Sequence, residues 1–197
     1  GSLREEIRPG ELALTAQYFD HTRGKRDYSF FGDGVSAHVS SAYPTCPALS
    51  ADVSDAAARI KQPLHTAKTY ACVEGPRLGT RAESFFLRDS ARCDLVGMTN
   101  VPEVFLAREA QMAYCTLCLV TDYDCWMDDP QEHVSVDKFF ATYQDTRTKA
   151  QAVLTELLKA PFRPTPDEVR HALTGAVLTA EDALSKEQSD WLKVLRS

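Results

Sequence analysis

The sequence predicts an α/β layer architecture with a helical tail, on three observations. Segments typical of strands alternate with segments of helical periodicity as far as residue 160. The segment 112–122 ("MAYCTLCLVTD") is almost continuously apolar or small, which is typical of a central strand covered by helices on both faces. Beyond the proline-marked break at 160–166 ("APFRPTP") only helical patterns remain.

The first half of the chain divides into two strands, a loop and a helix. The segment 12–20 ("LALTAQYFD") predicts one strand, and 64–73 ("LHTAKTYACV") predicts a second that ends where "EGPR" begins. Between them, apolar residues recur at helical spacing over 48–61. The polar, glycine-containing segment 21–47 predicts a long loop, and loops of this length tend to be functional or to pack on a partner subunit.

The second half repeats this alternation and then becomes helical. The helix expected over 99–111 has Thr99 or Asn100 as its N-cap, Pro102 near its first turn and Glu103 within it. The predicted elements are, in order, a helix over 80–90, a short buried strand over 93–98, the helix over 99–111, the strand over 112–122, a long helix over 134–160 and two shorter helices.

Composition limits the class of protein. The chain has 197 residues, 44% of them hydrophobic, and a formal charge of −6 with both signs mixed along its length. These values predict a globular domain and argue against a nucleic-acid partner. No apolar run reaches the roughly 18 to 20 residues that cross a bilayer, and no basic-then-apolar leader opens the chain. We therefore expect no membrane association and a cytoplasmic location.

The six cysteines have no framework spacing, which indicates reduced thiols in a chain of this size. Cys115 and Cys118 form a Cys-x-x-Cys, the spacing of redox and zinc sites. On a strand, residues three apart face opposite sides, and neither a second pair nor a nearby histidine completes a ligand set. We therefore expect no metal site.

Two aspartates at the end of the apolar segment are the first candidate site residues. In "CLVTDYDCW", Asp122 and Asp124 are separated by one tyrosine. Residues two apart in an extended chain point the same way, so the carboxyl groups either share a ligand or cap a turn. Ligands bind at the carboxyl ends of strands in α/β sheets. Met98 and Thr99 end the strand 93–98 in the same way, so both strand ends face one pocket if the strands are neighbours.

Four ordered motifs carry a resemblance to a known family. They are "SLREEIRPGE" (2–11), "VEGPRLGTRAESFFLR" (73–88), "VGMTNVPEVFLAREA" (96–110) and "VTDYDCW" (120–126). In this order they closely resemble the trimeric purine nucleoside phosphorylase family, and within it the members that act on 5′-methylthioadenosine. The resemblance implies a three-layer, mixed-sheet nucleoside phosphorylase fold. It assigns 1–160 to the C-terminal part of one such domain and 161–197 to a helical extension of that domain.

The resemblance also implies an activity. Such members cleave the bond between ribose C1′ and adenine N9, with inorganic phosphate as co-substrate and no cofactor, in purine and methionine salvage. As the bond breaks, the purine accumulates negative charge, so a carboxylic acid near N7 meets a chemical need. By resemblance Asp122 is that acid, and Asp124 or a backbone carbonyl receives the exocyclic amine. Relatives that act on 6-oxopurines carry Asn where Asp122 stands.

Further substrate contacts follow from the same resemblance. Met98 packs against the ribose and Thr99 binds phosphate or ribose, although core packing and a helix cap fit these residues as well. Leu78 and Gly79 stand where animal-type members have an aromatic and a hydroxylated residue beside adenine, so base packing differs. The other substrate-binding residues implied are Thr121, His38 from a neighbouring subunit, Val136, Phe139 and Phe140. The spacing of the last three equally fits an ordinary helix core.

One departure from the family pattern concerns phosphate. Family members carry a Gly-rich turn and an Arg–His pair before the first motif, and neither occurs in these 197 residues. We expect the remaining phosphate ligands in an associated N-terminal fragment of the same protein, because its loss would leave sheet edges unpaired. The expected partners are therefore the nucleoside, phosphate, that fragment and the other subunits of a homotrimer.

Two alternatives stay open at this point. One is a related 6-oxopurine nucleoside phosphorylase, against which Asp122 argues. The other is an inactive truncated remnant that only oligomerises. Glu74 and Arg77, which share one turn, have the charges of a catalytic ion pair, but a structural role is the simpler interpretation.

Overall fold

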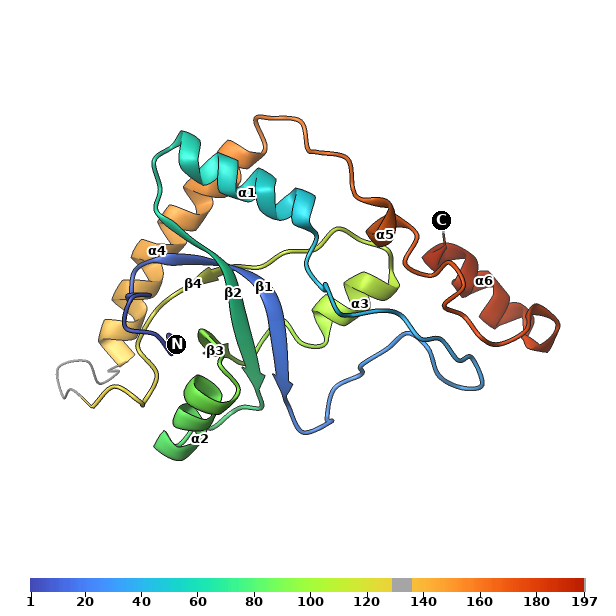
Figure 1. Cartoon of the computed structure of the whole chain (residues 1–197), viewed down its shortest axis with the longest axis horizontal. Coiled ribbons are helices and arrows are strands. Elements are labelled where there is room, and N and C mark those ends of the chain that lie inside the picture. Colours follow the sequence, from blue (N-terminus) through green and yellow to red (C-terminus); the bar gives the residue numbers. More distant parts are fainter. Residues whose placement is uncertain (129–135, 197) are drawn as a thin grey trace.

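A mixed sheet with helices on both faces forms the body of the molecule (Figure 1). The computed structural model describes residues 1–128 and 136–196. The sheet order is β3-β2-β1-β4, with β2 parallel to β1 and β3 and with β4 antiparallel to β1. The strands are β1 (Leu12–His21), β2 (Leu64–Val73), β3 (Leu95–Gly97) and β4 (Leu117–Leu119). The predicted α/β class and the strands at 12–20, 64–73 and 93–98 are confirmed.

Two helices cover one face of the sheet, and a third covers the other. Leu12 of β1 is fully buried in the cluster formed with α1 and α4, whereas Ala13 is fully buried in the cluster with α3. This alternation follows from the period of two along a strand. The helical elements are α1 (Pro47–Arg59), α2 (Arg81–Phe85), the π-helix η1 (Phe86–Ser90), α3 (Glu103–Glu109), α4 (Val136–Leu157), α5 (Asp167–Arg170), the 3-10 helix η2 (Glu181–Ala183) and α6 (Lys186–Leu195).

The C-terminal segment packs against the long loop at 21–47. Ala37 and Val177 form an isolated bridge, and the rings of Phe31 and Trp191 lie 5.8 Å apart. Figure 1 shows α6 beside this loop and away from the sheet. The loop and the two short terminal helices therefore match the prediction, and the loop packs against the tail.

Two predictions about regular structure are wrong. The apolar segment 112–122 is not a central strand, because only Leu117–Leu119 pairs and β4 stands at the end of the strand order. Part of the segment is buried by loop contacts instead, and the carbonyl of Tyr114 accepts a hydrogen bond from the backbone N–H of Cys46 at 2.8 Å. The helix expected over 99–111 starts at Glu103 because Asn100 has a φ of +75°, which excludes a helical start there.

The sheet is closed into a ring of backbone hydrogen bonds by Ser2. Ser2 forms a bridge to Leu95 of β3 on one side and to Tyr123 on the other. The backbone N–H of Ser2 donates to the carbonyl of Asp122 at 2.8 Å, and its carbonyl accepts from the N–H of Asp124 at 2.9 Å. Ser2 therefore lies between β3 and the segment that follows β4, although β3 and β4 stand at opposite ends of the strand order.

Candidate functional site

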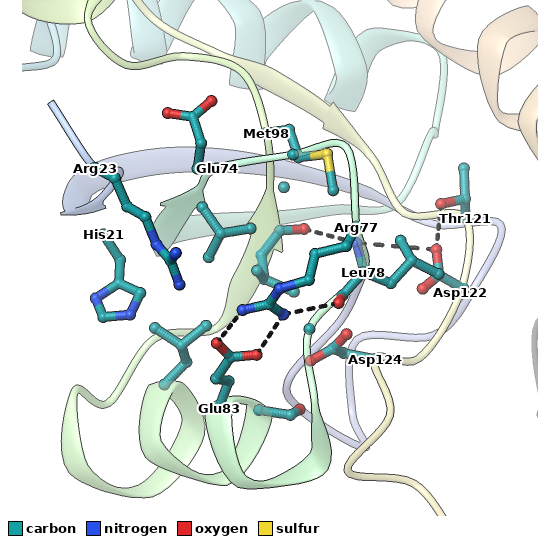
Figure 2. A pocket seen from close by; sticks show the side chains of 18 of the residues that line it. His21, Arg23, Glu74, Arg77, Leu78, Glu83, Met98, Thr121, Asp122 and Asp124 are labelled. Carbon is teal, nitrogen blue, oxygen red and sulfur yellow. Dashed lines mark hydrogen bonds and ion pairs between the residues drawn. The ribbon is translucent and has the colours of Figure 1, made fainter. Parts of the chain in front are cut away.

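A cavity of about 510 Å³ lies where β1, β2 and β3 end (Figure 2). These strands are parallel, so their carboxyl ends meet at one edge of the sheet. The segment that follows β4 completes the wall, and the cavity holds both acidic and basic side chains. Of the predicted site residues, it is lined by Asp122, Asp124, Met98, Leu78, Gly79, Thr121 and Phe139.

Asp122 and Asp124 share one wall of the cavity. The chain is extended here and bonds to Ser2 on both sides of Tyr123, so the two aspartates point the same way. Tyr123 packs instead with the buried cluster around Leu3, with its ring 5.8 Å from that of Trp126. The hydroxyl of Thr121 donates to Asp122 Oδ1 at 2.6 Å and orients that carboxyl group.

The aspartates reach the cavity by a different route from the one that the sequence predicts. The aspartates were expected at the carboxyl end of a central strand next to the strand 93–98. β4 is antiparallel to β1, and its carboxyl end lies beside Leu12, the first residue of β1. The aspartates reach the cavity because the chain then leaves β1 and pairs with Ser2. The two strand ends thus share a pocket through an intervening segment rather than as neighbours.

The turn that carries Leu78 and Gly79 forms the rim of the cavity. Leu78 is 75% exposed. Arg77 donates to the Leu78 carbonyl at 3.0 Å and to both carboxylate oxygens of Glu83, at 2.8 and 2.6 Å (Figure 2). Glu83 also accepts from the N–H of Thr80, which caps α2. These bonds hold the pKa of Glu83 well below its ordinary value.

The pairing of Glu74 differs from the one considered from the sequence. Arg77 pairs with Glu83, and Glu74 pairs with Arg26 at 3.2 Å. Arg26 lies in the loop that follows β1, far from this turn in the sequence. Arg26 and Glu74 are 48 residues apart, so their pair carries no local signal, whereas Arg77 and Glu83 are only six residues apart, with Glu83 in the first turn of α2.

Met98 and Gly75 both line the cavity, and Met98 packs directly on Gly75. A Cβ atom built on Gly75 would lie 2.7 Å from Met98 Sδ, so only glycine leaves room for this contact. Thr99, the next residue, is exposed and does not line the cavity. Its hydroxyl lies 3.4 Å from that of Tyr70, and Pro102 rather than Thr99 occupies the N-cap of α3.

Three basic side chains in the wall were missed by the sequence interpretation. His21 ends β1, and Arg23 and Lys25 follow it. Figure 2 shows His21 and Arg23 on the side of the cavity opposite Asp122 and Asp124. The rule that ligands gather at strand ends could have found them, because they follow the strand 12–20 as Met98 follows the strand 93–98.

The structure does not bring every predicted residue to the cavity of its own chain. His38 is exposed, and its N–H donates to the carbonyl of Ala176 at 2.9 Å. Phe140 is 57% exposed, and its ring lies 5.6 Å from that of Phe139, which does line the cavity. The side chain of Val136 lies outside the described part of the structure.

The cysteines face different parts of the core. Cys115, which precedes β4, packs against the cluster of α1 and α4, whereas Cys118 on β4 packs against the cluster of α3. Burial raises the pKa of Cys115 to about 11 and that of Cys118 to about 12. Within residues 1–128 and 136–196, no group of three or more metal-ligating side chains is close enough to hold an ion.

No helix in the described part of the chain combines the length and the apolar character needed to cross a membrane. The longest helix, α4, has 22 residues but carries many charged and polar side chains.

Comparison with known proteins finds this chain similar to phosphorylases. The family model for the phosphorylase superfamily matches residues 1–159. The S-methyl-5′-thioadenosine phosphorylase of Thermosynechococcus vestitus is 41% identical over 199 residues, covering 99% of this chain and 68% of the relative. The chain therefore spans about two thirds of the length of that relative.

Solved structures of methylthioadenosine phosphorylases are also similar to this chain in fold. A methylthioadenosine phosphorylase from an Antarctic soil metagenomic library has a TM-score of 0.86 at 37% identity, covering 99% of this chain and 68% of that one. The methylthioadenosine phosphorylase of Schistosoma mansoni in complex with adenine has a TM-score of 0.81 at 28% identity, covering 93% and 71% of the two chains.

Proposed function

This chain belongs to the phosphorylase superfamily, and we propose that it carries out the phosphorolysis of 5′-methylthioadenosine. An oxygen of inorganic phosphate attacks ribose C1′, and the bond from C1′ to adenine N9 breaks. The electron pair of that bond goes to the purine, and the products are adenine and 5-methylthioribose 1-phosphate. The relatives at 37 to 41% identity are named for this substrate.

One observation carries the proposal: Asp122 and Asp124 share a cavity with Met98. Purine N7 is an acceptor, so an aspartate bonds to it favourably only when it is protonated, and the same proton neutralises the leaving base. Asp122 takes this role, and the hydroxyl of Thr121 bonds to one oxygen and leaves the other for the base. Asp124 accepts from the exocyclic amine, which favours 6-aminopurines over 6-oxopurines.

The remaining residues of the cavity accommodate the rest of the nucleoside. Leu78 and Gly79 form an apolar rim beside the base, without the ring stacking of an aromatic residue at that position. The thioether of Met98 packs on the ribose face. Phe139 adds apolar surface for the methylthio group.

Phosphate is the only co-substrate in this proposal, and no cofactor takes part. Protonation of the leaving base and binding of the anion meet the chemical need without a redox step. Thr99, exposed directly after Met98, is available to an anion. The other phosphate ligands are assigned to an associated N-terminal segment, following the family pattern.

We further propose a homotrimer in which His38 completes the methylthio pocket of a neighbouring subunit. His38 is exposed and lies outside the cavity of its own chain, so it is free to serve another copy. A cytoplasmic role in purine and methionine salvage accords with this substrate. Light scattering that reports a monomer at micromolar concentration would contradict the trimer and the shared pocket.

The decisive experiment compares Asp122→Asn and Asp124→Asn in the full-length protein. Asp122→Asn keeps the shape and a hydrogen bond but removes the proton that the base must receive. We expect kcat/KM for methylthioadenosine to fall by at least about 10², roughly 2.7 kcal/mol in the barrier. For methylthioinosine it should fall less, or rise, because the amide suits a 6-oxo group. Asp124→Asn should cause a milder loss.

Two controls separate the proposal from other activities. Wild-type protein should release adenine only when phosphate is present, whereas release in phosphate-free buffer would indicate a hydrolase. If Asp122→Asn leaves the preference for 6-amino over 6-oxo substrates unchanged, the aspartates form a turn and the purine is recognised elsewhere.

A further inference from the structure

Arg26 connects two walls of the cavity without lining it. Its guanidinium donates to the carboxylate of Glu74 at 3.2 Å and to the carbonyl of Met98 at 3.0 Å. It also donates to the carbonyl of Val101 and lies 3.5 Å from Cys72 Sγ. The side chain is 21% exposed, so these bonds are partly shielded from water.

Two of these bonds hold the segment 98–101, which follows β3. β3 pairs with β2 only over Leu95–Gly97, so Met98 follows the last residue that the ladder holds. Met98 therefore lies outside the residue pairs that constrain the strand. The bonds from Arg26 to the carbonyls of Met98 and Val101 supply that constraint at both ends of the segment 98–101.

The same guanidinium also bonds to Glu74, in the turn that follows β2. Glu74 precedes Gly75, the residue on which Met98 Sδ packs. Within the described part of the chain, the second carboxylate oxygen of Glu74 is buried without a hydrogen-bond partner, so Arg26 compensates this charge. Arg26 therefore bonds to both the Glu74 turn and the Met98 segment. A planar fork with five donors can do this, whereas a lysine ammonium cannot reach all the acceptors in the same geometry.

We propose that Arg26 is a positioning residue that holds Met98 against Gly75 and thereby fixes the part of the cavity that receives the sugar. The inference rests on the proposed function only in naming the sugar as the group that Met98 contacts. Arg26 touches neither substrate nor reacting atoms and acts through Met98. Arg23 and Lys25, its neighbours in the sequence, line the cavity directly, which sets Arg26 apart from them.

The first test follows Met98 without any substrate. The chain has three methionines, Met98, Met112 and Met127, so methyl-labelled methionine gives a simple NMR spectrum in which Met98→Ala assigns the Met98 signal. We expect Arg26→Lys to shift or broaden the Met98 methyl signal and to leave the other two in place. Arg147→Lys, an exposed arginine on α4, is the matched control. An unchanged Met98 signal in Arg26→Lys would overturn the inference.

The second test separates positioning from general destabilisation in the full-length protein. Arg26→Lys should weaken methylthioadenosine binding about 10-fold, because a small displacement at a substrate contact is costly, while the affinity for free adenine stays within about 2-fold. Arg26→Lys combined with Met98→Ala should bind the nucleoside no more weakly than Met98→Ala alone.

Parallel losses for adenine and nucleoside would make Arg26 a merely structural residue. Fully additive losses in the double variant would show that it acts elsewhere than through Met98. A wild-type protein that does not cleave methylthioadenosine would refute the proposed function, and the NMR result would still decide the position of Met98.

Discussion

Met98 Sδ lies so close to the Cα of Gly75 that a Cβ atom there would be 2.7 Å away. The contact joins the turn that follows β2 to the segment that follows β3, and both residues line the cavity. A methionine side chain is flexible, so a larger residue at position 75 displaces the thioether rather than the backbone.

Gly75→Ala should therefore impair nucleoside binding more than folding. We expect KM for methylthioadenosine to rise about 10-fold because the thioether no longer lies against the sugar. The melting temperature should change little. Gly32→Ala is the matched control, since a Cβ atom at Gly32 meets nothing within 4 Å. Equal kinetic effects of the two substitutions would contradict the role of this contact.

Gly97→Ala should instead impair folding. A Cβ atom at Gly97 would lie 2.0 Å from the hydroxyl and 2.8 Å from Cζ of Tyr70, and Tyr70 is only 6% exposed in the core. We expect the free energy of unfolding, measured by urea denaturation, to fall by about 1–3 kcal/mol. Adding Tyr70→Phe removes the nearest atom and should restore part of the loss. A double variant no more stable than Gly97→Ala would contradict this explanation.

The bond between Arg77 and Glu83 should affect the binding of the purine base rather than the binding of the sugar. Glu83→Gln keeps an acceptor for the N–H of Thr80 but removes the charge that Arg77 pairs with. Because this pair is partly exposed, we expect only about a 2- to 5-fold weaker affinity for adenine, with kcat nearly unchanged. Glu187→Gln, also in the first turn of a helix, is the control. A large loss of kcat would indicate that Glu83 takes part in the chemistry.

Stability should fall at high pH. Burial raises the pKa of Tyr70 to about 12 and that of Cys118 to about 12, from ordinary values of 10.0 and 9.0. The folded state therefore keeps protons that the unfolded chain loses between about pH 9 and pH 12, so the free energy of unfolding decreases as pH rises through that window. Below about pH 9 both states are protonated, and these groups contribute no slope.

Urea denaturation at pH 8.0 and pH 10.5 checks this prediction, with the pH values chosen on either side of about pH 9. Cys118→Ala removes one of the groups and should make the decrease shallower. Equal free energies of unfolding at the two pH values, in wild type and variant alike, would show that these groups titrate alike in the folded and unfolded states.

Local patterns predicted much of the secondary structure. The strand at 64–73 has the predicted bounds, and the strand at 12–20 extends by only one residue. Period-two and helical spacing reflect which side of one element is buried, and each can be recognised within about ten residues. The prediction for the segment 112–122 was wrong because only Leu117–Leu119 pairs and most of the segment is only half-buried, and an apolar run alone does not distinguish loop packing from strand pairing.

The candidate site was only partly predictable. Seven of its residues follow from the strand-end rule or from the family resemblance, including Asp122, Asp124 and Met98. His21, Arg23 and Lys25 follow from the same rule, because they stand at and just beyond the end of the first strand. Arg26 was not accessible, because its partners lie 46 to 75 residues away in the sequence.

The sequence by itself determined the order of most strands and helices, the common direction of Asp122 and Asp124, and the family. Each of these depends on residues close together in the chain or on a motif. Only the tertiary structure decided that Ser2 joins the aspartate segment to β3, that Glu83 rather than Glu74 pairs with Arg77, and that Arg26 holds Met98. The Arg77–Glu83 pair is set by the turn that leads into α2. The contacts of Ser2 and Arg26 depend on which distant segments meet when the sheet forms, and no periodicity within one segment records the identity of its distant partner.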